Sequence, residues 1–282
     1  MKRLFQRFIG VDLGGGRGKT TALAEVRIGP AGAEVIEVAT RAGKQAWTDD
    51  TLVNRLAVSD PAVVIAIDAP LTQTACNRCE VPVCPGTDAC ADPAVVWLRT
   101  EGRALVRQEG VERKTMGAKT EALPRPVIGA QARLAPYTHR ATDVVMTYGR
   151  GLLPLSALGA ANGAITARAN QLRRRLRGVG FELHQNLIEV SPQATVAALC
   201  GPRMARGYKR DADPWRTRAL ILEQLADLRF APQSRMAREE VLGNDHCFDA
   251  VISAYTAYLW ARDGWEVPAE LARDGWIAVP PD

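Results

Sequence analysis

Four acidic residues stand where apolar segments of the chain end or begin, although they come from widely separated parts of the sequence. They are Asp12, Asp68, Glu189 and Asp249. Clustered carboxylates repel one another, so a site built from them needs cations, and the hard divalent ions Mg²⁺ and Mn²⁺ prefer oxygen ligands. Two such ions would activate a water molecule and stabilise the leaving oxygen in phosphodiester hydrolysis. The pattern therefore predicts a metal-dependent phosphodiesterase or nuclease.

The segment that carries Asp12 favours a β-hairpin. Residues 8–11 form a short apolar strand, a glycine-rich turn follows Asp12, and residues 20–28 favour a second strand. Glycines supply the positive φ angles that tight turns often need. The hairpin could serve the turn alone, or it could present a carboxylate as in ribonuclease H and the actin-like ATPases.

A phosphate-binding P-loop is a third interpretation of this segment. Gly18-Lys19-Thr20 fits the end of such a loop, but Leu13 occupies the position of its first glycine. A P-loop also requires a helix after its lysine, whereas the residues that follow here favour a strand. The hairpin is therefore the preferred interpretation.

A continuous apolar run over residues 62–67 predicts a strand that is buried on both faces and ends at Asp68. Two elements separate it from the hairpin, a third strand over residues 33–39 and a helix over 47–58. If the strands that end at Asp12 and Asp68 are parallel neighbours, both carboxylates lie at the edge of the sheet where ligands bind in α/β folds.

The rest of the chain predicts further helices, one strand and an irregular tail. The helices are expected over 93–107, 138–148, 156–177, after Pro192, over 214–229 and over 244–262, the strand over 187–190 and the tail after Gly264. We expect a single domain over residues 1–282, in which residues 71–183 are an insertion that covers the core.

The last helix carries the remaining candidate ligands in its first turns. His246 and Asp249 are three residues apart and share a helix face, whereas Asn244 or Asp245 could simply cap the helix.

The chain resembles the predicted nucleases of ribonuclease H fold, a domain-of-unknown-function family related to the Holliday-junction resolvases. The matching pieces are GVDLGGG, AIDAPL, PYTHRATDVVM, IEVSP and NDHCFDA. The resemblance implies a mixed sheet of strand order 3-2-1-4-5, flanked by helices, with a large insertion after strand 4. It also implies that Asp12, Asp68 and Asp249 are metal ligands, with Glu189 and either His246 or Asp245 assisting.

A cysteine cluster in the expected insertion predicts a second metal site. Cys76, Cys79, Cys84 and Cys90 have the spacing C-x2-C-x4-C-x5-C. Four thiolates can close a tetrahedral Zn²⁺ site with a structural role. An iron–sulfur cluster uses the same ligands and is the second choice, and unrelated thiols in a proline-rich loop are the third interpretation.

The charge of the chain permits an anionic partner such as DNA or RNA. The 36 Lys and Arg residues exceed the 31 Asp and Glu residues, which gives a net charge of +5. Lys19 and Arg140 are candidates for substrate binding, although Arg140 is also placed to pair with Asp143. No apolar run reaches the length of a membrane span, and the N-terminus lacks the apolar core of a signal peptide, so a cytoplasmic protein is expected.

Two other functions remain open. An actin-like ATPase or sugar kinase also begins with an Asp-x-Gly hairpin, as in Asp12-Leu13-Gly14, but it needs a second such hairpin that we do not find. A catalytically inactive nucleic-acid-binding protein is the other alternative, although a phosphate binder gains nothing from clustered carboxylates.

Overall fold

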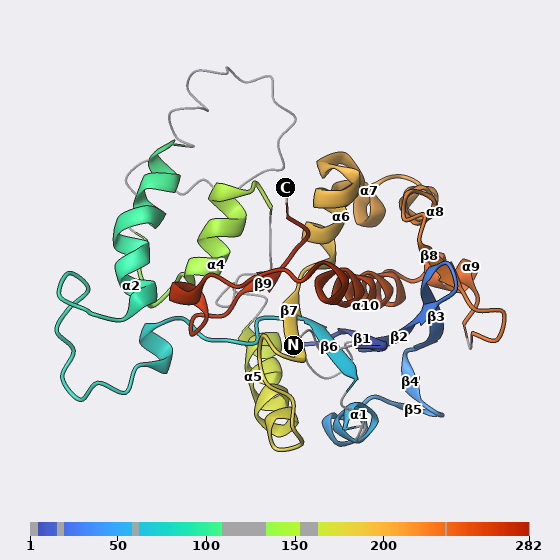
Figure 1. Ribbon diagram of the computed structural model, residues 1–282, viewed down its shortest axis with the longest axis horizontal. Helices are drawn as coiled ribbons and strands as arrows, with labels where there is room; N and C mark the ends of the chain where they lie inside the picture. The colour runs from blue at the N-terminus through green and yellow to red at the C-terminus, as the bar shows by residue number, and fades with distance from the viewer. Residues whose placement is uncertain are drawn as a thin grey trace.

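A computed structural model describes residues 5–15, 20–57, 62–108, 134–152, 163–234 and 236–281 (Figure 1). Its centre is a seven-stranded mixed sheet in the order β8-β3-β2-β1-β6-β7-β9. The strands are β1 Arg7–Asp12, β2 Ala22–Gly29, β3 Gly32–Ala39, β6 Val63–Asp68, β7 Leu187–Val190, β8 Leu228–Phe230 and β9 Ile277–Ala278. A separate two-stranded ribbon is formed by β4 Arg41–Ala42 and β5 Gln45–Ala46.

The predicted hairpin is present, and the predicted strand order is incomplete. Strands β1, β2 and β3 are antiparallel neighbours, and β6 lies parallel to β1 on its other side. The expected order 3-2-1-4-5 corresponds to β3-β2-β1-β6-β7, but it is wrong for the whole sheet because β8 and β9 add parallel strands at the two edges. The P-loop interpretation is also wrong, since a strand follows the glycine turn where that loop requires a helix.

One face of the sheet is covered by the long helix α10 and by the helices packed around it (Figure 1). These helices are α10 Asp245–Asp263, α6 Pro192–Cys200, α7 Pro202–Arg210, α8 Pro214–Gln224 and α9 Arg238–Gly243. Every residue of α10 from 247 to 259 is buried, as expected of a helix enclosed on all sides. Side chains such as Phe8 of β1 and Val64 of β6 point from the sheet into this core.

The opposite face is covered by α1 Asp49–Leu56 and α5 Gly163–Arg177. Ile9 and Ile65, the neighbours in sequence of Phe8 and Val64, belong to this second core, as the alternation of side chains along a strand requires. Thr48 caps α1 by accepting a hydrogen bond from Thr51. Helix α5 lies within residues 71–183, the range expected to be an insertion. That range therefore includes a helix that packs directly on the sheet.

A third, smaller cluster lies beside the sheet and joins the middle of the chain to its C-terminal segment. Helix α2 Pro93–Trp97 continues as η2 Leu98–Gly102, and α4 Ala141–Val144 continues as η4 Val145–Gly149. Their apolar side chains pack with Leu271 of η5 Ala269–Leu271, and Figure 1 shows this group next to β9. The short turn η1 Cys76–Arg78 precedes α2.

Two sequence expectations about the last third of the chain are wrong. The helix expected over 214–229 ends at Gln224, and its last residues instead form the edge strand β8. The tail after Gly264, expected to be irregular, contributes η5 and the edge strand β9. Strands of two or three residues are too short to show an alternating pattern. Among the helices of the described segments, none is both long and apolar enough to cross a membrane.

Candidate metal centre

Asp12 and Asp68 sit side by side at the carboxyl ends of two parallel strands. They are register partners in the ladder between β1 and β6. Their side chains share the face of Phe8 and Val64, because every second residue of a strand points to the same side. Both carboxylates are therefore directed toward the face that α10 covers.

A glycine brings α10 against this part of the sheet. A Cβ atom at Gly10 would lie 2.1 Å from the carbonyl oxygen of Ala250 and 2.3 Å from the amide nitrogen of Ala254. Only a residue without a side chain permits such a close approach of strand and helix backbones. Because Gly10 is two residues from Asp12, and Asp249 precedes Ala250, this contact places Asp249 above the strand ends.

The three aspartates Asp12, Asp68 and Asp249 form what we call the carboxylate trio. Each offers one oxygen, and these oxygens all lie within 4.8 Å of one another. Asp249 is buried, whereas Asp12 and Asp68 are half-buried. Among the described residues, the trio is the place where three His, Cys, Asp or Glu side chains come this close together. A donor set made only of carboxylate oxygens fits a hard divalent cation such as Mg²⁺ or Mn²⁺.

His246 lies at the edge of the trio. Its Nδ1 atom is 2.6 Å from Oδ2 of Asp12, and this hydrogen bond raises the pKa of the imidazole. Asn244 caps α10 by accepting hydrogen bonds from the amides of His246 and Cys247. The capping role thus belongs to Asn244. Asp245 lies in the first turn of α10 but is not among the three clustered carboxylates.

Two residues of α7 complete the surroundings of Asp249, and the sequence analysis missed both. The Tyr208 hydroxyl donates to Oδ1 of Asp249 at 2.9 Å, and Lys209 Nζ lies 2.5 Å from Oδ2. Burial lowers the pKa of Lys209, but Asp249 outweighs that effect and raises the pKa to about 12. The ammonium group therefore acts as a fixed counter-charge to the trio.

The trio is electrostatically strained without a cation. Burial raises the pKa of Asp68 well above its usual value, and the charges of Asp12 and Asp249 raise it further. Burial also raises the pKa of Asp249, to about 6, although Lys209 opposes the shift. Like charges that share a partly buried site disfavour joint ionisation, and a divalent cation would relieve this repulsion.

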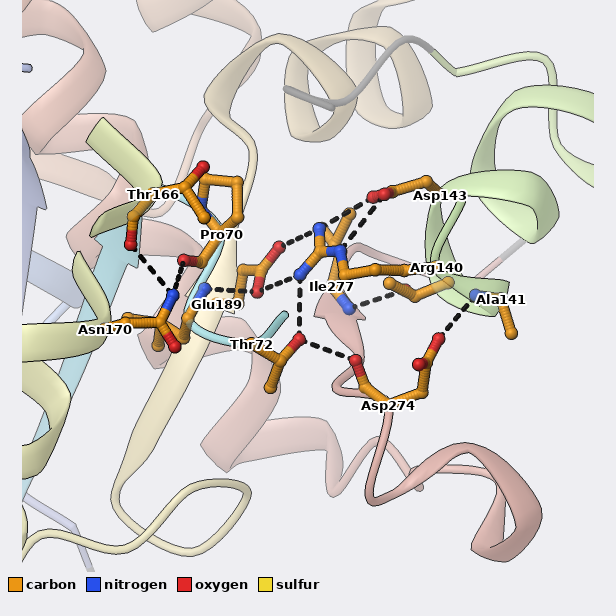
Figure 2. Close-up of polar contacts among 12 residues, drawn as sticks. Pro70, Thr72, Arg140, Ala141, Asp143, Thr166, Asn170, Glu189, Asp274 and Ile277 are labelled. Carbon is orange, nitrogen blue, oxygen red and sulfur yellow. Dashed lines mark hydrogen bonds and ion pairs between the residues drawn. The ribbon is translucent and has the colours of Figure 1, made fainter. Parts of the chain in front are cut away.

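Glu189 lies apart from the trio because of its register. It pairs with Ile67 of β6, not with Asp68. Since Ile67 faces the core beneath α1 and α5, Glu189 points to the opposite side of the sheet from the aspartates. Arg140 donates to both of its oxygens, at 2.7 and 2.8 Å, and the amide of Leu71 donates to it at 2.8 Å (Figure 2).

Arg140 is completely buried at the centre of an ion network (Figure 2). Besides Glu189 it binds both oxygens of Asp143, at 2.7 and 3.0 Å, which confirms that these two residues pair. It also donates to Thr72, whose hydroxyl donates to the backbone carbonyl of Asp274. Substrate contact by Arg140 stays a prediction.

The network fixes the segment that follows Asp68. Leu71 and Thr72 are held by Glu189, Arg140 and Asp274. These partners come from β7, from the start of α4 and from the C-terminal segment. The strand end that presents Asp68 is therefore attached to three distant parts of the chain.

The other candidate residues from the sequence lie outside the carboxylate trio. Lys19 lies outside the described residues. The four clustered cysteines are free thiols, three of them exposed and Cys90 half-buried, and their sulfurs are not gathered within 4.8 Å as the trio is. Several arginines of α5 bind the protein itself. They are Arg168 with Asp49, Arg173 with Leu71, Arg175 with Asp50 and Arg177 with Glu182.

The fold and the trio define a mixed α/β protein with a carboxylate cluster at the carboxyl edge of its sheet. The family model described as "Protein of unknown function (DUF429)" matches residues 10–273, which include the whole trio. The chain belongs to the DUF429 family. No curated protein and no solved structure matches it.

Proposed function

We propose that the protein is a metal-dependent nuclease or phosphodiesterase of ribonuclease H-like fold. The observation that carries the proposal is the convergence of Asp12, Asp68 and Asp249 within 4.8 Å at the ends of two parallel strands. Carboxylates brought this close are costly to keep ionised, and such sites in proteins bind hard cations. The proposed ions are Mg²⁺ or Mn²⁺, held by the trio.

The order of the strands supports the ribonuclease H-like part of the proposal. An antiparallel β1-β2-β3 unit presents the first acid, and β6, parallel to β1, presents the second. A helix near the C-terminus then delivers the third acid, as in the family that the sequence resembles. This arrangement is built from the same residues that the motifs GVDLGGG, AIDAPL and NDHCFDA contain.

The surroundings of the trio fit hydrolysis of a phosphodiester. Bound cations would supply an activated water and stabilise the charge that develops on the leaving oxygen. His246, held by Asp12, is placed to exchange a proton at the exposed side of the site. Lys209 is more than a third exposed and adds a positive charge beside the carboxylates, which suits an anionic substrate such as DNA or RNA.

The test offers single-stranded DNA, double-stranded DNA, RNA, a branched junction and ATP to the purified protein with Mg²⁺ or Mn²⁺. Asp12→Asn should abolish cleavage, because asparagine keeps the size of the side chain and loses the charge that holds the cation. Asp50→Asn is the matched control, since Asp50 is exposed on α1 and pairs only at the surface with Arg175.

The outcomes separate the proposed function from its alternatives. Cleavage lost in Asp12→Asn and kept in Asp50→Asn supports the nuclease. Turnover of ATP without cleavage of nucleic acid would move the protein to the actin-like class. Binding of nucleic acid without turnover, unchanged by Asp12→Asn, would indicate an inactive binding protein.

A further inference from the structure

The four cysteines of residues 76–90 lie in a loop, here called the cysteine loop, that the proposed catalytic site does not use. Cys76 and Cys79 occupy one turn, because η1 starts at Cys76 and the amide of Cys79 donates to the carbonyl of Cys76 at 3.3 Å. The first two thiols thus belong to one short turn. All four cysteines are free, so none is held in a disulfide.

Two arginines fold the cysteine loop back on itself. Arg78, between the first two cysteines, donates to both carboxylate oxygens of Asp92, at 3.1 and 3.3 Å. Arg99 of η2 donates to the carbonyl oxygens of Thr87 and Asp88, at 2.8 and 2.6 Å. The two ends of the loop are therefore fastened together, and the chain around Cys90 returns toward its beginning.

The last cysteine is also held in the folded loop. Arg99 donates to the carbonyl oxygen of Cys90 at 3.4 Å, as well as to those of Thr87 and Asp88. The loop is therefore folded along its length, and none of its four thiols is fully enclosed by protein.

The cysteine loop has no apolar core of its own. Every residue from 79 to 89 is exposed, including Val81 at 58% and Val83 at 80%. A segment like residues 79–89, which buries no apolar side chain, gains little stability from packing, and small loop-rich segments of this kind are commonly held by metals. Gly86 has a positive φ of 84°, a backbone conformation that glycine adopts without strain.

We propose that Cys76, Cys79, Cys84 and Cys90 bind one metal centre through four thiolates, with Zn²⁺ as the expected ion. With zinc–sulfur bonds of about 2.3 Å, tetrahedral binding draws the sulfurs to roughly 3.8 Å from one another. The exposed part of the loop, around Cys84, supplies the movement. The centre replaces the core that the loop lacks, and it does not depend on the proposed nuclease activity.

A side chain of the cysteine loop also fastens the loop to the rest of the molecule. Arg78 donates to Asp274 at 3.3 Å as well as to Asp92. Asp274 in turn accepts a hydrogen bond from the amide of Ala141, at the start of α4. Metal binding thus orders a segment that contacts the same C-terminal residues as the buried ion network of Arg140.

The test measures metal on the full-length protein purified without chelators. We expect about one equivalent of zinc per chain by elemental analysis. The double variant Cys79→Ser/Cys84→Ser should lose it, whereas Cys200→Ser should keep it, because Cys200 lies at the end of α6 outside the loop. Circular dichroism verifies that each variant is folded, and Co²⁺ titration of the metal-free protein reports thiolate ligation by its sulfur-to-cobalt absorption.

Each outcome bears on the proposal. One equivalent of zinc with thiolate–cobalt absorption supports it, and iron with acid-labile sulfide and visible absorption supports it in the iron–sulfur form. Failure to bind zinc, iron or cobalt through thiolates overturns it, and so does metal retained in full by the double variant. Cobalt bound by the carboxylate trio lacks the sulfur absorption, so loss of the catalytic site is distinguished from loss of this one.

Discussion

Gly10 and Ala250 are in backbone contact, with the Cβ position of the glycine 2.1 Å from the carbonyl oxygen of the alanine. Gly10→Ala therefore has to push α10 away from β1. Overpacking of this kind costs about 1–3 kcal/mol of unfolding free energy, and it also moves Asp249 away from Asp12. We expect lower stability in urea denaturation and weaker Mn²⁺ binding in calorimetry.

The matched control is Gly163→Ala at the start of α5, where a Cβ atom would have no neighbour within 4 Å. That variant should leave Mn²⁺ binding unchanged and unfold at the same urea concentration or a higher one. Equal stability and Mn²⁺ affinity in Gly10→Ala and the wild type would contradict the role of this contact.

The carboxylate trio should make the metal-free protein less stable as pH rises. The pKa of Asp249 is about 6 in the folded protein, above its ordinary value of 3.8, so the folded state holds a proton that the unfolded state has lost. The contribution of Asp249 to stability is then present below about pH 4 and is lost between about pH 4 and pH 6. Asp249→Asn should remove this part of the pH dependence in urea unfolding curves recorded with a chelator.

Addition of Mg²⁺ or Mn²⁺ above pH 6 should restore stability to the wild type, because a ligand that binds only the folded state stabilises it. The same addition should do little for Asp249→Asn. If neither ion changes the melting temperature of the wild type at pH 7.5, that result would argue against a metal site.

Lys209 should compete with the cation. Its ammonium group lies 2.5 Å from Asp249 and is partly exposed, so its repulsion of a divalent ion is screened but not abolished. Lys209→Met should raise Mn²⁺ affinity about three- to tenfold and lower the stability of the metal-free protein. Lys209→Arg, which keeps the charge, should behave like the wild type in the same calorimetric titration, and higher Mn²⁺ affinity in both variants would exclude the charge as the cause.

Glu25 should make the protein sensitive to acid. Burial alone would raise its pKa, but hydrogen bonds from Arg7, Arg55 and Arg27 outweigh that effect and lower the pKa to about 2. Because the folded-state pKa is depressed, the stabilisation is present above about pH 4.5 and is lost as pH falls toward 2.

Glu25→Gln should therefore lower the unfolding free energy at pH 7 by about 2–3 kcal/mol and flatten its decline in acid. Urea denaturation at pH 7, 4.5 and 3 measures both effects. Glu34→Gln on the neighbouring strand β3 is the control, and parallel curves for wild type and Glu25→Gln would refute the assignment.

Arg140→Met should be among the most destabilising single changes, because it leaves the buried carboxylates of Glu189 and Asp143 without their cation. Breaking a buried ion pair in this way costs about 3–5 kcal/mol. Arg140→Met/Glu189→Gln should recover part of the loss, since one uncompensated charge is removed. A double variant no more stable than Arg140→Met, measured by thermal unfolding, would show that packing and not charge dominates.

Much of the fold is predictable from local patterns. The glycine turn after Asp12, the apolar run that ends at Asp68 and the cap at Asn244 each give a signal within a few residues, and the structure confirms the elements that they mark. The edge strands β8 and β9 give no such signal. Their pairing depends on neighbours that lie far away in the sequence, β3 and β7 respectively.

The candidate site is predictable wherever the position of a residue along a strand or helix decides which way its side chain points. Asp12 and Asp68 are in register and share a face, so the expectation that they meet is confirmed. Glu189 also lies near a strand end, but a shift of one residue in register turns it to the other face. Lys209 could not be foreseen, because α7 is short and rich in arginine, a composition typical of a solvated surface.

The hydrogen bond between His246 and Asp12 joins residues 234 positions apart. A ribosome that adds about 5–20 residues per second needs roughly 10 to 50 s to cover that distance. Throughout this interval a nascent chain carries Asp12 without the helix that delivers Asp249. The carboxylate trio is thus completed only when synthesis has passed the sheet's central strands and reached α10.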